Sequence, residues 1–129
     1  MNEFKHYDGD LLVKSVTDRV RMVAFPYQRY SKVVDKHILV PRGFHTDFAS
    51  VPRLPLVFML LGGRADRASV IHDYLYSTQT FDRKTSDRIF LEHMGEDGIN
   101  IIYRYLMYWG VRAGGFFAWR RHTRRLGRV

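Results

Sequence analysis

The 129-residue sequence contains no cysteine, so neither disulfide bonds nor thiolate metal ligands are available to it. No apolar run approaches the roughly 20 residues of a transmembrane helix; the longest purely apolar run, residues 54–61, contains Pro55. The first ten residues also lack the apolar core of a signal peptide. These absences favour a cytoplasmic protein without a membrane span.

Acidic residues are also few, since 13 Asp and Glu stand against 21 Lys and Arg and give a formal net charge of +8. Without the five arginines of residues 118–129 that charge would be +3. We therefore predict one domain over residues 1–117, followed by a basic tail that suits anionic lipid or nucleic acid. A solvated, frayed terminus is the alternative. The arginines of this tail are Arg120, Arg121, Arg124, Arg125 and Arg128.

The pattern of apolar residues changes from strand-like to helix-like along the chain. Residues 11–13, 20–25 and 33–40 are rich in β-branched residues or partly alternate, and turn residues separate them. Strands followed by helices, without βαβ alternation, indicate an α+β fold. We expect a small N-terminal antiparallel sheet, then a helical hairpin and a third, C-terminal helix.

Capping residues predict the bounds of the three helices. The first spans residues 67–77 after an Asp66 cap, and the second spans residues 83–94 between Asp82 and Gly95. The third spans residues 98–112 and ends near Gly114 and Gly115.

One constellation in the hairpin is suited to chemistry. His72 and Tyr76 are four residues apart and share a helix face. Asp87 lies on the apolar face of the next helix, together with Phe90 and Met94. A buried carboxylate there needs a partner, and His72 on the neighbouring helix is the natural one. We therefore expect a contact between His72 and Asp87.

A histidine held by a carboxylate has one nitrogen fixed as a donor and the other free to act as a base. Asp73 points roughly 100° away from His72 on the helix and is placed to hold a cation beside that base. The alternative is that Asp87 only braces His72 and Tyr76 as a satisfied polar cluster in the core.

The proline-bounded segment 43–55 carries a second set of candidates. Asp47 is a candidate metal ligand and Ser50 a candidate substrate-binding residue, because rigid loops often carry such groups. The alternative is that either side chain caps local backbone amides in a turn. His45, in the same segment, and His93 are expected at the surface.

Three motifs, GFHTDFASVPR, ASVIHDYLY and SDRIF, together resemble the domain-of-unknown-function 1353 family of phages and prophages. The resemblance covers roughly residues 38–94. It implies a bacteriophage or prophage origin, and with it a place in the host bacterial cytoplasm or the virion. It implies no particular activity.

A second, weaker resemblance is to the active-site helices of phospholipases A2 of the parvoviral type. It is carried by the segment HDYLY and by the D-x-x-F spacing of Asp87 and Phe90 on the following helix. That likeness implies that His72 activates water, that Asp73 binds calcium, and that Tyr76 and Asp87 orient His72. It favours Ca²⁺, with Zn²⁺ or Mg²⁺ as alternatives. The glycine-rich calcium loop of phospholipases A2 is not found, and only residues 43–47 stand in its place.

Two classes of function therefore compete. The first is a metal-dependent hydrolase acting on lipid or ester at an anionic membrane surface; an HD-type phosphohydrolase is a less favoured variant. The second is a non-enzymatic phage accessory protein, either a virion or tail-assembly component or a binder of a host protein. Nucleic-acid binding through the basic tail has the least support. The hydrolase requires His72 and Asp73 to be accessible, whereas the accessory protein predicts a sealed cluster with surface apolar residues elsewhere.

The third expected helix also bears on this choice, because four of its residues are aromatic. They form either a packing face or an interface, and a packing face is the more common outcome for aromatics at helical spacing. The four are Tyr103, Tyr105, Tyr108 and Trp109.

Overall fold

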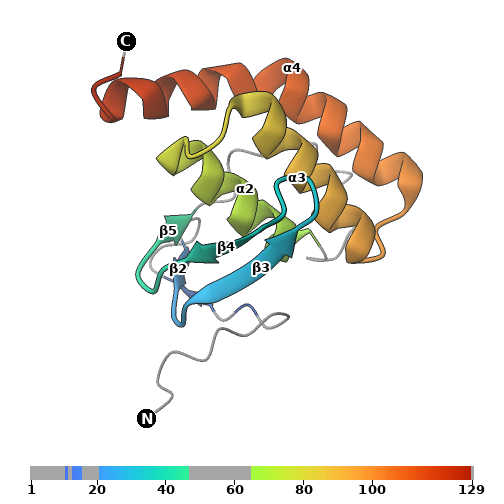
Figure 1. Ribbon diagram of the computed structural model, residues 1–129, viewed down its shortest axis with the longest axis horizontal. Helices are drawn as coiled ribbons and strands as arrows, with labels where there is room; N and C mark the ends of the chain where they lie inside the picture. Colours follow the sequence, from blue (N-terminus) through green and yellow to red (C-terminus); the bar gives the residue numbers. More distant parts are fainter. Residues whose placement is uncertain (1–10, 12, 16–20, 47–64, 129) are drawn as a thin grey trace.

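The computed structural model describes residues 11, 13–15, 21–46 and 65–128, and it has the expected α+β architecture (Figure 1). Within these ranges, two small antiparallel sheets lie on one side of three helices. The strands are β1 (Val13–Ser15), β2 (Arg21–Val23), β3 (Tyr27–Ser31), β4 (Lys36–Val40) and β5 (His45–Thr46). The helices are α2 (Asp66–Thr78), α3 (Arg83–Glu96) and α4 (Ile101–Arg125).

The sheets are built from local hairpins. One sheet has the order β1-β2-β5, and the other is the β3–β4 hairpin, in which Tyr27 pairs with Val40 and Ser31 with Lys36. Along β4 the buried Ile38 and Val40 flank the exposed Leu39. This alternation gives the hairpin one apolar face, which needs a helix to cover it.

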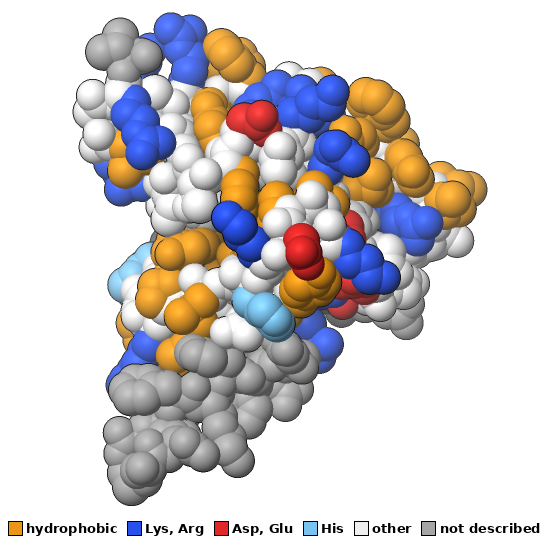
Figure 2. Space-filling model, viewed as in Figure 1, with side chains coloured by type: hydrophobic (Ala, Val, Ile, Leu, Met, Phe, Trp, Pro, Cys, Tyr) orange, Lys and Arg blue, Asp and Glu red, His pale blue; other side chains and the backbone are white. Residues whose placement is uncertain are grey.

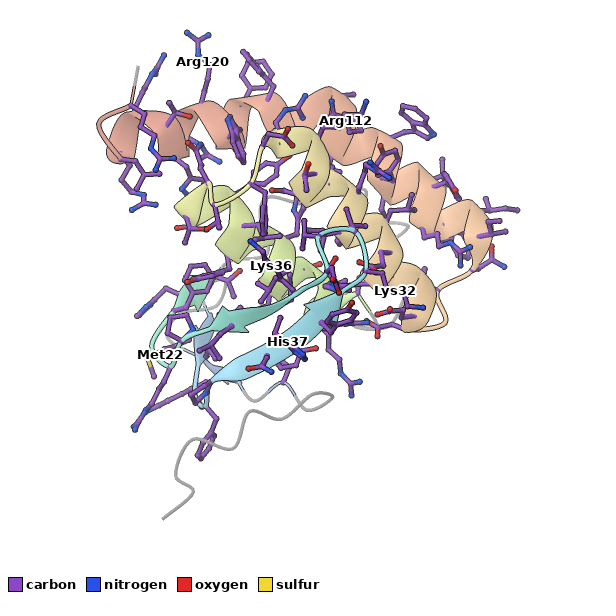
Figure 3. The ribbon with its side chains drawn as sticks, viewed as in Figure 1. Met22, Lys32, Lys36, His37, Arg112 and Arg120 are labelled. Atoms are coloured by element: carbon purple, nitrogen blue, oxygen red, sulfur yellow. The ribbon has the colours of Figure 1, made fainter. Side chains whose placement is uncertain are left out.

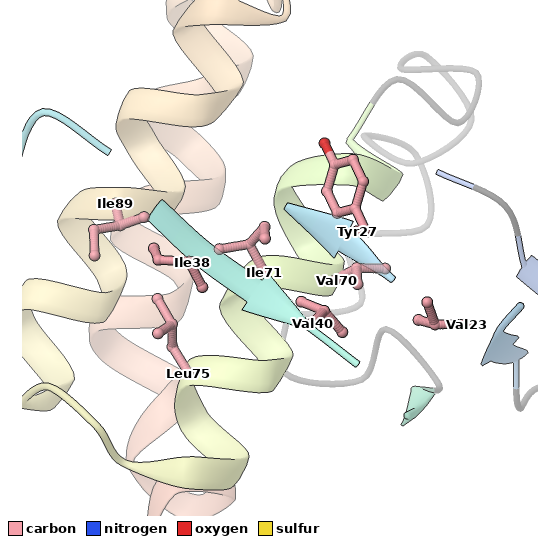
Figure 4. Packing of buried hydrophobic residues seen from close by; sticks show 8 residues of the cluster. All are labelled: Val23, Tyr27, Ile38, Val40, Val70, Ile71, Leu75 and Ile89. Carbon is pink, nitrogen blue, oxygen red and sulfur yellow. The ribbon is translucent and has the colours of Figure 1, made fainter. Parts of the chain in front are cut away.

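Helix α2 supplies that cover and forms the centre of the core. Val70, Ile71 and Leu75 of α2 are buried against the hairpin, together with Ile89 of α3 (Figure 4). A second apolar cluster lies mainly between α3 and α4. It contains Ala65, Ala68, Phe90, Met94, Ile99, Met107 and Val111.

The predicted ends of the first two helices are partly right. Asp82 caps α3 as expected, because its side chain accepts a hydrogen bond of 2.7 Å from the Thr85 backbone nitrogen. For α2 the N-cap is Ala65, which has no side chain to cap with, and Asp66 lies in the first turn. Gly95 does not end α3, which continues to Glu96.

The predicted end of the third helix is wrong, because α4 passes through Gly114 and Gly115 and continues to Arg125. Gly115 is needed for packing: a Cβ there would lie 2.5 Å from the Tyr76 hydroxyl oxygen. Further along α4, the Trp119 carbonyl and the Thr123 hydroxyl accept hydrogen bonds from the side chain of Gln79. Residues 118–125, expected at the start of a tail, are therefore the last turns of α4. The division into a domain and a tail stays a prediction.

Polar contacts join the β3–β4 hairpin to the end of α3. Arg29 forms a bidentate pair with Asp97, with N–O distances of 2.9 and 2.7 Å. His93, expected at the surface, is fully buried, and its Nε2 lies 3.1 Å from the Tyr30 carbonyl oxygen. Burial, followed by the positive charge of Arg29, lowers the pKa of His93 to about 4. His45 is exposed, as predicted.

Candidate functional site

The predicted contact between His72 and Asp87 is confirmed. His72 and Tyr76 lie on the face of α2 that packs against α3, where Asp87 is fully buried. The Nε2 atom of His72 is 2.7 Å from Oδ1 of Asp87. The Tyr76 hydroxyl donates a hydrogen bond of 2.6 Å to the same oxygen. One carboxylate oxygen of α3 therefore holds two side chains from successive turns of α2.

The other oxygen of Asp87 is held by arginines. Arg112 of α4 donates to Oδ2 at 2.7 Å, and Arg83 lies 3.5 Å from the same atom. Arg83 also donates to the backbone carbonyls of Val111 and Arg112, which ties the start of α3 to the middle of α4. Figure 3 shows Arg112 at this crossing of α4 with α3. Asp87 thus joins α2, α3 and α4 through polar contacts.

Neither arginine was identified from the sequence. Arg83 is four residues before Asp87 on the same helix, so the i, i+4 spacing of opposite charges would have revealed it. Arg112 is 25 residues away, and no local spacing places it beside Asp87.

The partners of Asp87 fix its protonation state. Burial opposes ionisation of the carboxyl group, but hydrogen bonds from His72, Tyr76 and Arg112 outweigh burial and lower the pKa of Asp87. Burial and the negative charge of Asp87 raise the pKa of Tyr76, so its hydroxyl keeps its proton. An ionised carboxylate only accepts hydrogen bonds, so Nε2 of His72 carries the proton. In a neutral imidazole, Nδ1 is then the unprotonated nitrogen.

Two buried polar atoms near this contact have no hydrogen-bond partner among the described residues: Nδ1 of His72 and Oγ of Ser69. Ser69 is three residues before His72, so both lie on the same side of α2. Buried polar atoms without a partner are uncommon and call for a specific explanation, such as a water or a ligand. The sequence reasoning missed Ser69, although its spacing from His72 was visible.

The imidazole of His72 is enclosed in this structure. It has no exposed surface, and the Tyr76 and Phe90 rings lie with their centroids 4.3 and 4.7 Å from its own. Asp73 is 7% exposed. The accessibility of both side chains that the hydrolase interpretation requires is therefore not found in this structure, whereas the hydrogen bond that it requires is present.

The predicted metal site is not tested. Asp47 and Ser50 lie outside the described residues. Within the ranges that the structure does describe, no group of three or more His, Asp or Glu side chains is placed to hold a metal ion. In the same ranges, no helix has the length and apolar character needed to cross a membrane.

Comparison with known proteins identifies a family. The family described as "Protein of unknown function (DUF1353)" matches residues 22–111, an interval that contains both His72 and Asp87. No curated protein and no solved structure matches the chain. The resemblance to phospholipases A2 receives no support from these comparisons.

Proposed function

The chain belongs to the DUF1353 family of proteins of unknown function, and from the site we propose that it is a hydrolase in which His72 activates water. One observation carries the proposal. His72 is held through Nε2 by the ionised Asp87, while its Nδ1, the nitrogen without a proton in a neutral imidazole, has no partner among the described residues. This is the arrangement of a general base oriented by a carboxylate.

The proposed reaction is hydrolysis of a carboxylic ester. Nδ1 accepts a proton from a water molecule as the water oxygen bonds to the ester carbonyl carbon. The Nε2–H···Asp87 hydrogen bond stabilises the imidazolium that forms. When the tetrahedral intermediate collapses, the ester C–O bond breaks and the imidazolium returns its proton to the leaving alkoxide. Asp87 remains ionised throughout because Arg112 and Arg83 hold its second oxygen.

A divalent cation is part of the proposal, with Ca²⁺ favoured over Zn²⁺ or Mg²⁺. Asp73 follows His72 directly in α2, and Asp47 would be a second ligand, with Ser50 contacting the substrate. A bound cation would polarise the ester carbonyl. The described residues alone contain no group of three or more side chains placed to hold a metal ion. Dependence of activity on added metal is therefore the direct test of the proposed cation.

The enclosed imidazole sets a condition on this mechanism. Since His72 has no exposed surface, an ester reaches Nδ1 only after local opening around α2. Such opening of a native protein costs between almost nothing and the full free energy of unfolding. We therefore expect slow turnover that rises under conditions that loosen the fold without unfolding it.

The test uses a panel of soluble esters and phospholipids assayed with Ca²⁺, Mg²⁺ and Zn²⁺ in turn. His72→Gln keeps a donor for Asp87 but removes the base, and should lower the rate about a hundredfold or more. His37→Gln, on the exposed surface of β4, is the matched control and should leave the rate unchanged. A folded His72→Gln variant with full activity would reject the base, and so would a wild-type protein inert with every metal and substrate.

A non-enzymatic phage accessory protein, such as a virion component or a binder of a host protein, is the second candidate. It is supported by a specific observation: the polar cluster is sealed, while exposed apolar side chains gather on α4. In that case His72→Gln changes stability alone, and the function of the protein resides on the surface of α4.

A further inference from the structure

Helix α4 is apolar on two opposite faces. Met107, Val111, Gly115 and Ala118 follow one another at spacings of four, four and three residues and are all buried. This inner face packs against α2 and α3. A surface helix normally carries polar residues on the side away from the core, but between residues 101 and 117 that side of α4 is largely apolar.

The opposite side of α4, called here the outer face, is exposed and apolar. Ile102 is 66% exposed, Trp109 63% and Phe117 72%. Contiguous apolar surface of this kind marks a site of interaction with another molecule. Figure 2 shows hydrophobic side chains gathered where the N-terminal half of α4 lies in Figure 1. The exposed apolar residues of the outer face are Ile101, Ile102, Tyr105, Leu106, Trp109, Phe116 and Phe117.

The outer face becomes basic towards the C-terminus. Arg120 and Arg124 follow Phe116 at intervals of four residues, so they continue the same side of the helix. The guanidinium carbon of Arg120 lies 5.4 Å from the centre of the Phe116 ring, and Figure 3 shows this side chain extending away from the other helices. Residues 101–125 contain no acidic side chain. An apolar surface and a cationic surface are thus contiguous on one helix.

The charge pattern selects the occupant of this surface. A second copy of the chain would leave these arginines without an anion whichever way the two helices run, because α4 carries no acidic residue. A nucleic acid would match the arginines and aromatic rings but not the exposed aliphatic Ile101, Ile102 and Leu106. An anionic lipid surface matches both parts, since headgroup phosphates attract arginine and the acyl boundary accepts Trp, Ile and Leu.

We propose that the outer face of α4 docks on an anionic membrane surface, with the helix lying parallel to it. Ile102, Leu106 and Trp109 enter the boundary between headgroups and acyl chains, and Arg120 and Arg124 bind headgroup phosphates. No helix among the described residues is suited to span the bilayer, so α4 is placed on the membrane and not across it. The docking does not depend on hydrolysis at His72; if both proposals hold, the substrate is a lipid.

The test is sedimentation of the full chain with two kinds of vesicle, phosphatidylcholine alone and phosphatidylcholine mixed with phosphatidylglycerol in equal parts. We expect binding to the anionic vesicles only, weakened by added salt. In a Trp119→Phe background, Trp109 emission should shift to shorter wavelength on binding, because its indole leaves water. Equal binding to both vesicles, or binding to neither, overturns the proposal.

Matched variants locate the surface. Ile102→Ser with Trp109→Ser should weaken binding at least tenfold, and Arg120→Gln with Arg124→Gln about fivefold for each arginine removed. The apolar control is Phe25→Ser, since Phe25 is 50% exposed and distant in sequence from α4. The charge control is Lys36→Gln with Arg42→Gln, both exposed outside α4. Controls that lose binding as strongly as the α4 variants contradict the assignment.

Two further measurements separate the competing outcomes. If sedimentation equilibrium shows a dimer that Trp109→Ser abolishes, the outer face binds a second copy; if the chain binds a DNA or RNA oligonucleotide but does not sediment with anionic vesicles, it binds nucleic acid. Either result overturns lipid docking. His72→Gln should bind anionic vesicles as wild type does, so failure of the hydrolase proposal and failure of lipid docking are distinguishable.

Discussion

Tyr76 and Gly115 meet where α2 passes α4, and a Cβ on Gly115 would come within 2.5 Å of the Tyr76 hydroxyl oxygen. That hydroxyl is itself fixed by its hydrogen bond to Asp87. The site and the path of α4 are therefore linked, because the side chain that holds the carboxylate also requires a glycine on the neighbouring helix.

Gly115→Ala should destabilise the fold by about 1–3 kcal/mol, the usual cost of overpacking. Gly114→Ala is the matched control, because a Cβ at Gly114 meets nothing within 4 Å. There the change should stabilise α4 by about 0.5–1 kcal/mol, since alanine has the higher helix propensity. Urea unfolding of both variants measures the difference. Equal free energies of unfolding would contradict the close approach of Tyr76.

A double-mutant cycle tests which atom of Tyr76 causes the destabilisation expected for Gly115→Ala. Tyr76→Phe removes the hydroxyl, and the nearest remaining ring atom is 3.3 Å from the Cβ position. Gly115→Ala should therefore cost about 1 kcal/mol less in the Tyr76→Phe background than in wild type, a coupling typical of residues in contact. Additive effects of the two substitutions would show that the hydroxyl is not the obstacle.

Asp87→Asn should destabilise the protein by about 3–5 kcal/mol, because it breaks a buried ion pair and leaves the arginines without their anion. The comparison is Glu96→Gln, which removes a surface partner of Arg29 at 3.3 Å and should cost about 0–1 kcal/mol. Thermal and urea unfolding report both. A melting temperature for Asp87→Asn equal to that of wild type would place Asp87 outside the core.

Stability should fall between pH 6.5 and about pH 4 because of His93. Its folded-state pKa, about 4, is below the ordinary value of 6.5. The unfolded chain therefore binds the extra proton first, and stability present above pH 6.5 is lost as the pH falls. The change amounts to about 3 kcal/mol. Arg29, Glu92 and Asp97 surround the imidazole and contribute to its pKa.

His93→Gln checks this assignment, because glutamine also donates to the Tyr30 carbonyl but does not titrate. Urea unfolding at pH 7 and pH 4.5 should show a smaller difference for this variant than for wild type. An unchanged difference would assign the pH dependence to other groups. Asp87 acts in a separate, lower range, because its pKa lies below that of an ordinary carboxyl group.

The sequence by itself determined the α+β order, the three helices of the described residues and the contact between His72 and Asp87. These depend on local spacing: four residues bring His72 and Tyr76 to one face, and an apolar face containing Asp87 demands a partner nearby. The family also followed from short motifs, and the match over residues 22–111 confirms it.

Only the tertiary structure decided where α4 ends, how deeply His72 and His93 are buried, and that Arg112 completes the site. A glycine in a sequence can end a helix or let another element pack closely against the helix. Gly115 does the second, because the side chain of Tyr76, 39 positions earlier, lies against it. The aromatic residues of α4 likewise could not be assigned to the core or to the surface from the sequence. Helical spacing groups side chains into faces, but which face meets the core is set by the packing of other helices.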